Sequence, residues 1–409
     1  HFPSFVYVRD TPDAQFLTGL VEKYPRLDFW IPPVSKRNST VLVPPHIVQE
    51  FKVAVNKHGM RTFVLSDDVQ SIVDAGSKRT PEKVVLEKMR ASGQVVDHYN
   101  YHNYSTIRDY INKLESKYPR SVGVSTLTFF TQEGRYVTFA KLSNPYSSNK
   151  KPVIIVEAGI HGREWIAPAA TLWFMEKMLQ DYQSREPTAK LMLDKYDWFV
   201  VPVTNPDGYQ YSHTTASDPM WTKNRRYIRR ACRGVDLNRN FNTKIGTSDA
   251  NLRDQCETEF YHGYEPFSEP ESLNIRDLFD SLQPRVVAYV SVRAYGQSLL
   301  VPWSYTSDVS RPANHDKLDR VASLMARALS QRHGNEYSYG IADQRLDHAV
   351  SGNVIDWVQA KKPDVYAVML KLRPSISAMN GFLLPSSEII PTGEELYDSL
   401  AVLAREIPS

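Results

Sequence analysis

The stretch 157-EAGIHGREWIAPA-169 follows an apolar run, 153-VIIV-156, and carries two metal-ligand residue types three positions apart. His161 and Glu164 can converge on one metal ion from a single turn of chain, and a catalytic zinc site then needs a third protein ligand. In open α/β sheets, sites form beyond the carboxyl ends of strands, so this position suits a site. With 11 histidines in the chain, the spacing alone leaves a purely structural role equally open.

The composition is that of an ordinary globular protein of two or three domains. The chain has 409 residues, of which 42% are apolar and 23% are charged,. The net charge of +3 comes from 49 basic and 46 acidic residues, which gives no reason to expect a nucleic-acid partner,. No apolar run approaches the ~20 residues of a membrane span, so no membrane partner is expected. Nothing in the sequence indicates an oligomeric state.

Residues 1–75 are predicted to form a small domain of their own. Strand patterns in "SFVYVRD", "LDFWIPPV", "STVLVPP" and "RTFVLS" are interspersed with helical patterns in "TPDAQFLTGLVEKY" and "PHIVQEFKVAVNKHG". The first helix is expected to begin with Thr11 as its N-cap and Pro12 at its first position. The order β-α-β-β-α-β is that of an α+β ferredoxin-like sandwich.

Two further segments follow. Residues 76–96 are polar and basic, and they are predicted to form a connecting segment, either a solvated helix or a protease-sensitive connector,. Residues 97–409 alternate strands with helices and are predicted to form an α/β domain with a mixed sheet. The strands are expected in "VGVSTLTFF", "YVTFAKLS", "PVIIVEAG", "DWFVVPVTN", "RVVAYVSV" and "VYAVMLKL", and the helices in "TIRDYINKLESKY", "AATLWFMEKMLQDYQ", "KLDRVASLMARALSQRHG" and "EELYDSLAVLAREI".

The two cysteines, Cys232 and Cys256, are either two buried thiols or one disulfide. Two glycosylation sequons, at Asn38 and Asn103, favour an oxidising, extracellular compartment and therefore favour the disulfide,.

Five motifs together carry a resemblance. "GIHGREWIAPA", "VTNPDGY", "GVDLNRNF", "SGNVIDW" and "GFLLP" occur in this order, and with them the chain resembles the zinc carboxypeptidases of the A and B family in their proenzyme form. The resemblance covers nearly the whole length. It implies a secreted proenzyme with a pro-domain followed by a peptidase domain that removes C-terminal residues from peptides.

The resemblance assigns roles to individual residues. His161 and Glu164 match the first two zinc ligands, and Asp236 matches the carboxylate that orients the ligand histidine,. Cys232 and Cys256 match the family's disulfide. The residues matched to substrate binding are Arg163, Arg225, Asn238, Arg239, Tyr295 and Ile355.

Within that set, Arg225, Asn238 and Arg239 match the groups that clamp the terminal carboxylate of the substrate, for which the planar arginine fork is suited. Arg163 matches a residue on the substrate path. Ile355 stands at the specificity position, where an apolar residue implies aromatic or aliphatic C-terminal side chains.

Three catalytic positions depart from the family. Arg293 stands where the third zinc ligand, a histidine, is expected, and Lys371 stands where the general base, a glutamate, is expected. His348 replaces the mobile tyrosine that covers bound substrate. The segment between "LKLR" and "GFLLP" is also longer than in the family, which changes the expected pocket wall.

These departures predict a loss of activity. A guanidinium has no lone pair for a metal, and an ammonium cannot accept the proton of a metal-activated water. We therefore expect a secreted pseudoenzyme with no cofactor, whose cationic pocket binds a peptide or protein C-terminus. We also hypothesise that Arg293 or Lys371 replaces the zinc charge and pairs with Glu164, which would otherwise be a costly lone buried acid.

Two alternatives stay open. One is an active zinc carboxypeptidase with an altered site, which would release C-terminal aromatic or aliphatic residues and would need zinc. The other is that the retained residues are remnants that bind nothing.

Overall fold

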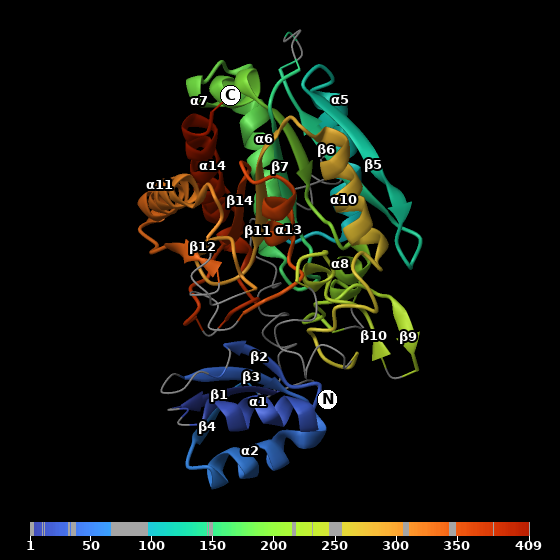
Figure 1. Cartoon of the computed structure of the whole chain (residues 1–409), viewed down its shortest axis with the longest axis vertical. Helices are drawn as coiled ribbons and strands as arrows, with labels where there is room; N and C mark the ends of the chain where they lie inside the picture. The colour runs from blue at the N-terminus through green and yellow to red at the C-terminus, as the bar shows by residue number, and fades with distance from the viewer. Residues whose placement is uncertain are drawn as a thin grey trace.

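The computed structural model of the chain (Figure 1) describes residues 4–9, 11, 13–31, 33, 38–66, 97–144, 146, 150–214, 218–230, 232–244, 256–305, 311–342, 349–378 and 380–408. The expected connecting segment 76–96 and His348 lie outside these residues.

The first domain is a four-stranded antiparallel sheet packed against two helices. The sheet order is β2-β3-β1-β4, formed by β1 (Ser4–Arg9), β2 (Asp28–Ile31), β3 (Ser39–Val43) and β4 (Arg61–Ser66). Helices α1 (Ala14–Lys23) and α2 (Val48–Lys57, preceded by the 3-10 turn η1, Pro45–Ile47) supply Leu17 and Phe51 to its core. The predicted ferredoxin-like sandwich is confirmed.

The predicted start of α1 needs a correction. The N-cap is Asp13, whose side chain accepts a hydrogen bond of 2.9 Å from the Phe16 backbone N–H, and the helix begins at Ala14. Aspartate is a better N-cap than threonine, so the helix starts two residues later than Thr11 suggests.

The larger domain is built on an eight-stranded mixed sheet. Strands β14, β11, β7 and β8 run parallel in the middle, and β12 and β6 pair antiparallel at either side. All six predicted strands are present, whereas β12 and β13 were not predicted. In spatial order the sheet contains β13 (Ser338–Ile341), β12 (Ser298–Val301), β14 (Tyr366–Lys371), β11 (Val286–Arg293), β7 (Val153–Ala158), β8 (Asp197–Val201), β6 (Tyr136–Leu142) and β5 (Val122–Phe130).

Helices cover both faces of this sheet (Figure 1). Along β7, Ile154 and Val156 enter one apolar cluster while Val153 and Ile155 enter the other, because successive strand residues point to opposite faces,. The first cluster is shared with α5 (Tyr104–Lys117), α6 (Ile166–Gln183), α7 (Pro187–Lys195), α8 (Pro206–Ser212), α11 (His315–His333) and α14 (Ile389–Glu406), and the second with α10 (Pro270–Leu282) and α13 (Val354–Lys361).

The two domains share a small apolar cluster centred on Trp30 of β2. Its ring lies 5.2 Å from Phe382 and 6.4 Å from Tyr295, measured between ring centroids. Gly381 has φ +43, and a Cβ there would stand 2.6 Å from the Trp30 ring. The close approach of the ring therefore requires glycine at this point of the loop.

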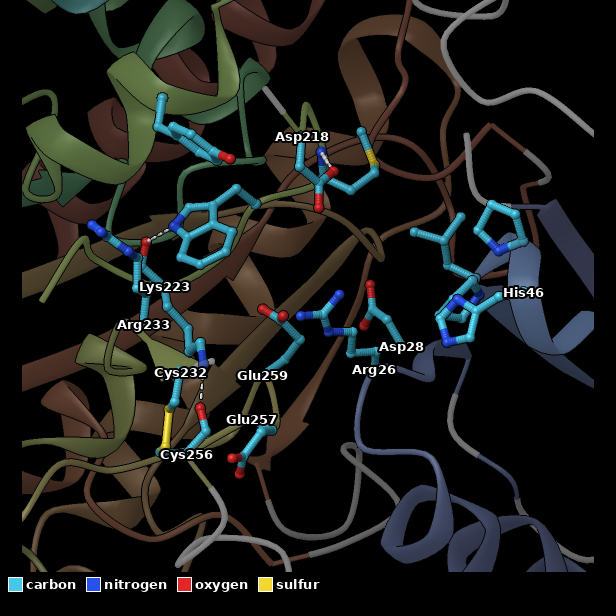
Figure 2. A pocket seen from close by; sticks show the side chains of 16 residues that line it. Arg26, Asp28, His46, Asp218, Lys223, Cys232, Arg233, Cys256, Glu257 and Glu259 are labelled. Atoms are coloured by element: carbon cyan, nitrogen blue, oxygen red, sulfur yellow. Dashed lines mark hydrogen bonds between the residues drawn. A yellow bond between two sulfur atoms is a disulfide. The ribbon is translucent and has the colours of Figure 1, made fainter. Parts of the chain in front are cut away.

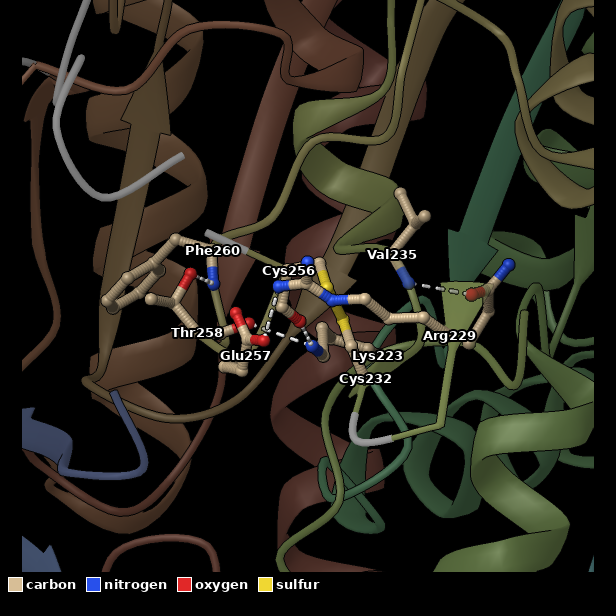
Figure 3. Close-up of a disulfide and its surroundings, with 9 residues drawn as sticks. Lys223, Arg229, Cys232, Val235, Cys256, Glu257, Thr258 and Phe260 are labelled. Carbon is tan, nitrogen blue, oxygen red and sulfur yellow. Dashed lines mark hydrogen bonds and ion pairs between the residues drawn. A yellow bond between two sulfur atoms is a disulfide. The ribbon is translucent and has the colours of Figure 1, made fainter. Parts of the chain in front are cut away.

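The cysteines form the disulfide Cys232–Cys256 (Figure 3). It ties the short ribbon of β9 (Tyr227–Arg229) and β10 (Cys232–Arg233) to the loop before α10. Beside it, the buried Lys223 Nζ donates to the backbone carbonyls of Cys256 (2.9 Å) and Thr258 (2.8 Å). Within the described residues, no helix is both long and apolar enough to cross a membrane.

Candidate functional site

His161 and Glu164 lie in the turn between β7 and α6, at the carboxyl end of the central parallel strands. The Nδ1 atom of His161 lies 2.9 Å from Glu164 Oε1, and its Nε2 atom lies 2.8 Å from Asp236 Oδ1. Asp236 precedes the 3-10 turn η2 (Leu237–Arg239). The structure therefore brings together the predicted ligand pair and the predicted orienting carboxylate.

Arg293 is the last residue of β11, and its side chain contacts both Glu164 and His161. Its Nε and Nη2 atoms each donate to Glu164, to Oε2 and Oε1, both over 3.0 Å. Nη2 also lies 2.6 Å from His161 Nδ1. All three side chains are largely buried. The hypothesised pairing of Arg293 with Glu164 is present in the structure.

Neighbouring charges shift the pKa values of Glu164 and His161. Burial alone would raise the pKa of Glu164, but Arg293 and His161 hold it well below its usual value,. For His161, burial and the Arg293 charge lower the pKa, whereas Asp236 and Glu164 raise it and leave it above its usual value. Glu164 is thus an ionised carboxylate whose counter-charge is a guanidinium.

The residues do not fit a zinc ion in this arrangement. A metal held by His161 Nδ1 and Glu164 would need the space that the Arg293 guanidinium fills, and arginine offers no lone pair as a third ligand,. The described residues contain one group with the spacing of a metal site, Cys232, Cys256 and Glu257, and its two sulfurs are joined in the disulfide.

Lys371, the last residue of β14, lies beside Arg293. The two residues are paired in register on adjacent parallel strands, so their side chains leave the same face of the sheet,. Burial, and then the Arg293 charge, lowers the pKa of Lys371 to about 8. Among the described residues, Lys371 has no ion pair or hydrogen bond from its Nζ atom, and Arg293 Nη1 is buried without an acceptor.

Sequence comparisons identify both domains. Residues 107–399 match the profile of the zinc carboxypeptidases, and residues 5–76 match that of the carboxypeptidase activation peptide. Mouse carboxypeptidase A1 is 34% identical over 92% of this chain and 86% of its own length. The chain belongs to the zinc carboxypeptidase family.

Other comparisons agree with this assignment. Zinc carboxypeptidase A 1 of Anopheles gambiae is 32% identical to this carboxypeptidase-family chain, over 90% of the chain and 80% of its own length. The crystal structure of thrombin activatable fibrinolysis inhibitor superposes with a TM-score of 0.84 at 26% identity, covering 99% of this chain and 98% of that one. Carboxypeptidase A from Helicoverpa armigera gives 0.83 at 26% identity, over 99% and 97%.

The predicted carboxylate clamp is only partly oriented toward the zinc-ligand positions of this carboxypeptidase-family chain. Arg239 donates from Nε to Asp236 over 3.2 Å, and Asn238 accepts from the Val354 backbone N–H over 3.3 Å. Arg225 instead stacks on aromatic rings, with its guanidinium 3.6 Å from the centroid of Tyr211. Arg239 therefore contacts Asp236 and Asn238 contacts the start of α13, whereas Arg225 contacts an aromatic ring.

The first domain engages two other predicted substrate-binding residues. Arg163 donates to both carboxylate oxygens of Asp28, and its guanidinium lies 4.2 Å from the Phe382 ring centroid. The Tyr295 hydroxyl donates to the backbone carbonyl of Trp30 over 3.4 Å. No local pattern marks Asp28 as a site residue, because its contact with Arg163 joins residues far apart in the chain.

The predicted specificity residue, Ile355, is fully buried. It lies on α13 within the apolar cluster that covers the sheet beneath the site. The structure therefore places it in the core, where its side chain contacts other apolar residues of that cluster.

A polar cavity of about 410 Å³ lies beside the domain contact (Figure 2). Asp28 and Arg26 from the first domain face Glu259 and Lys223 from the larger one across it. Burial raises the pKa of Glu259, and Asp28 raises it further, although Lys223 and Arg163 lower it. The contact between the two domains is thus partly apolar, around Trp30, and partly charged.

Proposed function

We propose that this chain is a secreted carboxypeptidase A-like protein that does not hydrolyse peptides and whose pocket binds a C-terminal carboxylate. The observation that carries the proposal is the Arg293 guanidinium, which makes two hydrogen bonds to Glu164 and lies 2.6 Å from His161 Nδ1. The protein thereby uses for an internal ion pair the two groups that the family uses to hold its metal.

The second support is the chemistry at position 371. Metal-dependent hydrolysis needs a base that takes a proton from water, and the residue at that position is a lysine with a pKa of about 8,. At neutral pH most of this side chain is an ammonium, which has no lone pair. Neither Arg293 nor Lys371 can then perform the step that its matched position has in the family, which is metal binding for the first and proton transfer for the second.

A carboxylate is the ligand class that the unpaired donors of this site favour. Lys371 Nζ and Arg293 Nη1 leave the same face of the sheet and have no acceptor among the residues described. Charge-assisted hydrogen bonds from such groups to a carboxylate are about twice as strong as neutral ones. Because Trp30 and Asp28 contact Tyr295 and Arg163, we expect peptides to bind better once the first domain has moved away.

Secretion is part of the proposal. The disulfide is typical of oxidising compartments, and Asn38 of the first sequon is exposed on the surface of the first domain,. Glycosylation at Asn38 in material from a secreting host cell would be the direct check.

Metal content and hydrolysis test the inactive site. Purified full-length protein, and the same protein after trypsin cleavage of its connector, would be measured for zinc per chain and for release of C-terminal Phe or Leu. We expect no stoichiometric zinc and no turnover. One zinc per chain with measurable turnover would instead establish the active enzyme with an altered site.

The double substitution Arg293→His and Lys371→Glu tests the cause of inactivity. It returns a third ligand and a carboxylate base, so we expect zinc to bind at close to one per chain. If zinc still fails to bind, the two cations are not what excludes it.

Binding of a peptide is tested separately. A peptide ending in a free carboxylate and the same peptide ending in an amide would be titrated into the cleaved protein. We expect the acid to bind ~10-fold or more tightly than the amide, and Lys371→Gln to reduce that preference. Equal binding of the two peptides would contradict carboxylate recognition, whatever the zinc content.

A further inference from the structure

A second groove has a volume of about 450 Å³. It is lined by parts of α5, α6 and α7, and α7 lies at the end of the larger domain farthest from the first domain (Figure 1). The end of α5, the following loop with Arg120, Tyr146, and the turn from α6 into α7 form its walls. None of the site residues described above lines it.

The lining is cationic. Lys117, Arg120, Arg185 and Lys190 line the groove, and none of its described lining residues is acidic. Lys117 is neutralised by Glu176 at 3.1 Å and Lys190 by Asp194 at 3.5 Å. Arg120 donates to the Tyr146 hydroxyl over 2.8 Å, which adds no negative charge. Arg185 has no ion pair or side-chain hydrogen bond with any residue that the structure describes.

Arg185 also occupies a backbone position that favours glycine. Its φ is +60, and it follows the end of α6. Its N–H donates to the Tyr182 carbonyl over 3.1 Å, and the Glu186 N–H donates to the Asp181 carbonyl over 2.9 Å, which is the Schellman pattern,. Helix α11 ends with Gly334 in the same left-handed conformation. The backbone of Arg185 is therefore strained, while its side chain places an exposed, unpaired guanidinium at the groove.

An aromatic surface accompanies the two arginines. Tyr146 is 74% exposed, and the hydrogen bond from Arg120 holds its ring at the groove. Tyr182 also contributes to the wall. An exposed ring in a groove lined by two arginines can contact a sugar ring on its face while the arginines bind oxyanions on that sugar,.

We propose that this groove binds a short segment of a sulfated polysaccharide, with sulfate groups on Arg120 and Arg185 and a sugar ring against Tyr146. The site is independent of the carboxylate pocket and of the first domain. Because its main attraction is electrostatic and solvent-exposed, binding should weaken strongly with salt.

The test uses the full-length protein and a heparin-derived oligosaccharide of defined length, titrated by calorimetry at 0.05 and 0.5 M NaCl. We expect the double variant Arg120→Gln, Arg185→Gly to bind ~10-fold or more weakly at low salt. Glycine suits the left-handed position, so we expect the unfolding midpoint of the single variant Arg185→Gly to stay unchanged or to rise.

The matched control is Arg311→Gln, Arg327→Gln, which removes the same charge from two exposed arginines outside the groove. We expect it to change affinity less than ~2-fold. If both double variants lost the same affinity, the binding would depend on net charge alone, which would overturn the proposal. Binding of uncharged dextran as tightly as the sulfated chain, or of phosphatidylserine vesicles in its place, would overturn it as well.

Discussion

Two buried arginine–glutamate pairs in this protein have the same geometry and different surroundings. In both, the guanidinium donates through Nε and Nη2 to one carboxylate: Arg293 to Glu164, and Arg373 to Glu395. The two pairs differ in the contacts of the third guanidinium nitrogen, Nη1. Nη1 of Arg373 donates to Glu388, whereas Nη1 of Arg293 is buried without an acceptor among the residues described.

The carboxylates differ in the kind of neighbour they have and not in the number of their contacts. Glu395 also accepts from Asn335 and from the Tyr337 hydroxyl, both over 2.8 Å, so its four contacts are all hydrogen bonds. Glu164 also has two contacts besides Arg293, to His161 at 2.9 Å and to the Ala294 backbone N–H at 3.2 Å, but Arg293 contacts the same imidazole. The Arg373 pair has every guanidinium donor satisfied, whereas the Arg293 pair, at the position matched to the family's zinc ligands, has one donor without an acceptor and an unpaired lysine beside it.

A third buried carboxyl group, Glu271, sharpens the comparison because no arginine or lysine pairs with it among the described residues. It accepts from Asn224 over 3.1 Å, and burial, with Glu269 nearby, raises its pKa from 4.5 to about 8. The folded state thus keeps this proton to higher pH than the unfolded chain does. The contribution of Glu271 to the free energy of unfolding should be complete below pH ~4.5. It should decrease by up to ~5 kcal/mol as the pH rises to ~8.

Urea unfolding of the wild type and of Glu271→Gln at pH 5, 7 and 8.5 measures this dependence. In the variant, the free energy of unfolding should decrease much less with rising pH, because the amide of Gln does not titrate. Parallel curves for the two proteins would assign the decline to other groups.

Breaking the complete pair should cost nearly as much. Glu395→Gln leaves the buried Arg373 short of a counter-charge, and we expect the free energy of unfolding to fall by ~3–5 kcal/mol in urea titrations. Glu394→Gln is the matched control, since Glu394 pairs with His333 at the surface and should change stability by less than ~1 kcal/mol,.

Breaking the incomplete pair should cost less. In Arg293→Gln, Glu164 keeps the His161 contact and the Ala294 backbone N–H at 3.2 Å as partners, so we expect a loss of ~2–3 kcal/mol. Arg293→Lys, which keeps the charge but not the fork, should fall between the wild type and the glutamine variant. A loss as large as that of Glu395→Gln would show that the two pairs are energetically equivalent.

The pair between the domains should give the smallest effect. Asp28→Asn keeps an acceptor for Arg163 but removes the charge, and Arg163 retains its contact with Phe382. We expect the docked state to lose ~1–2 kcal/mol, measured as hydrogen exchange that is ~5- to 30-fold faster in β2. Glu50→Gln, on the surface of the same domain, should leave this exchange unchanged.

Much of the fold could be predicted from local patterns, because long apolar strands and amphipathic helices carry strong periodic signals. The strands 298-SLLV-301 and 338-SYGI-341 were missed because four residues are too few to show a period,. The site was located through its motifs. The sequence also predicted that one of two cations, Arg293 or Lys371, pairs with Glu164. Which of them does so depends on how far each side chain reaches from its strand, and no sequence pattern indicates this. The Asp28 contact joins separate domains and has no local pattern.

Gly381 links the loop that follows Lys371 to the tryptophan of the first domain. The site on the larger domain therefore has one wall whose support comes from another part of the chain, rather than from the sheet that carries its charges. A protein from which the first domain has been cleaved and removed presents that loop without its aromatic anchor. In such a molecule the same residues would line a differently shaped opening, so cleavage of the connector would change the pocket that a ligand meets without changing a residue of the larger domain.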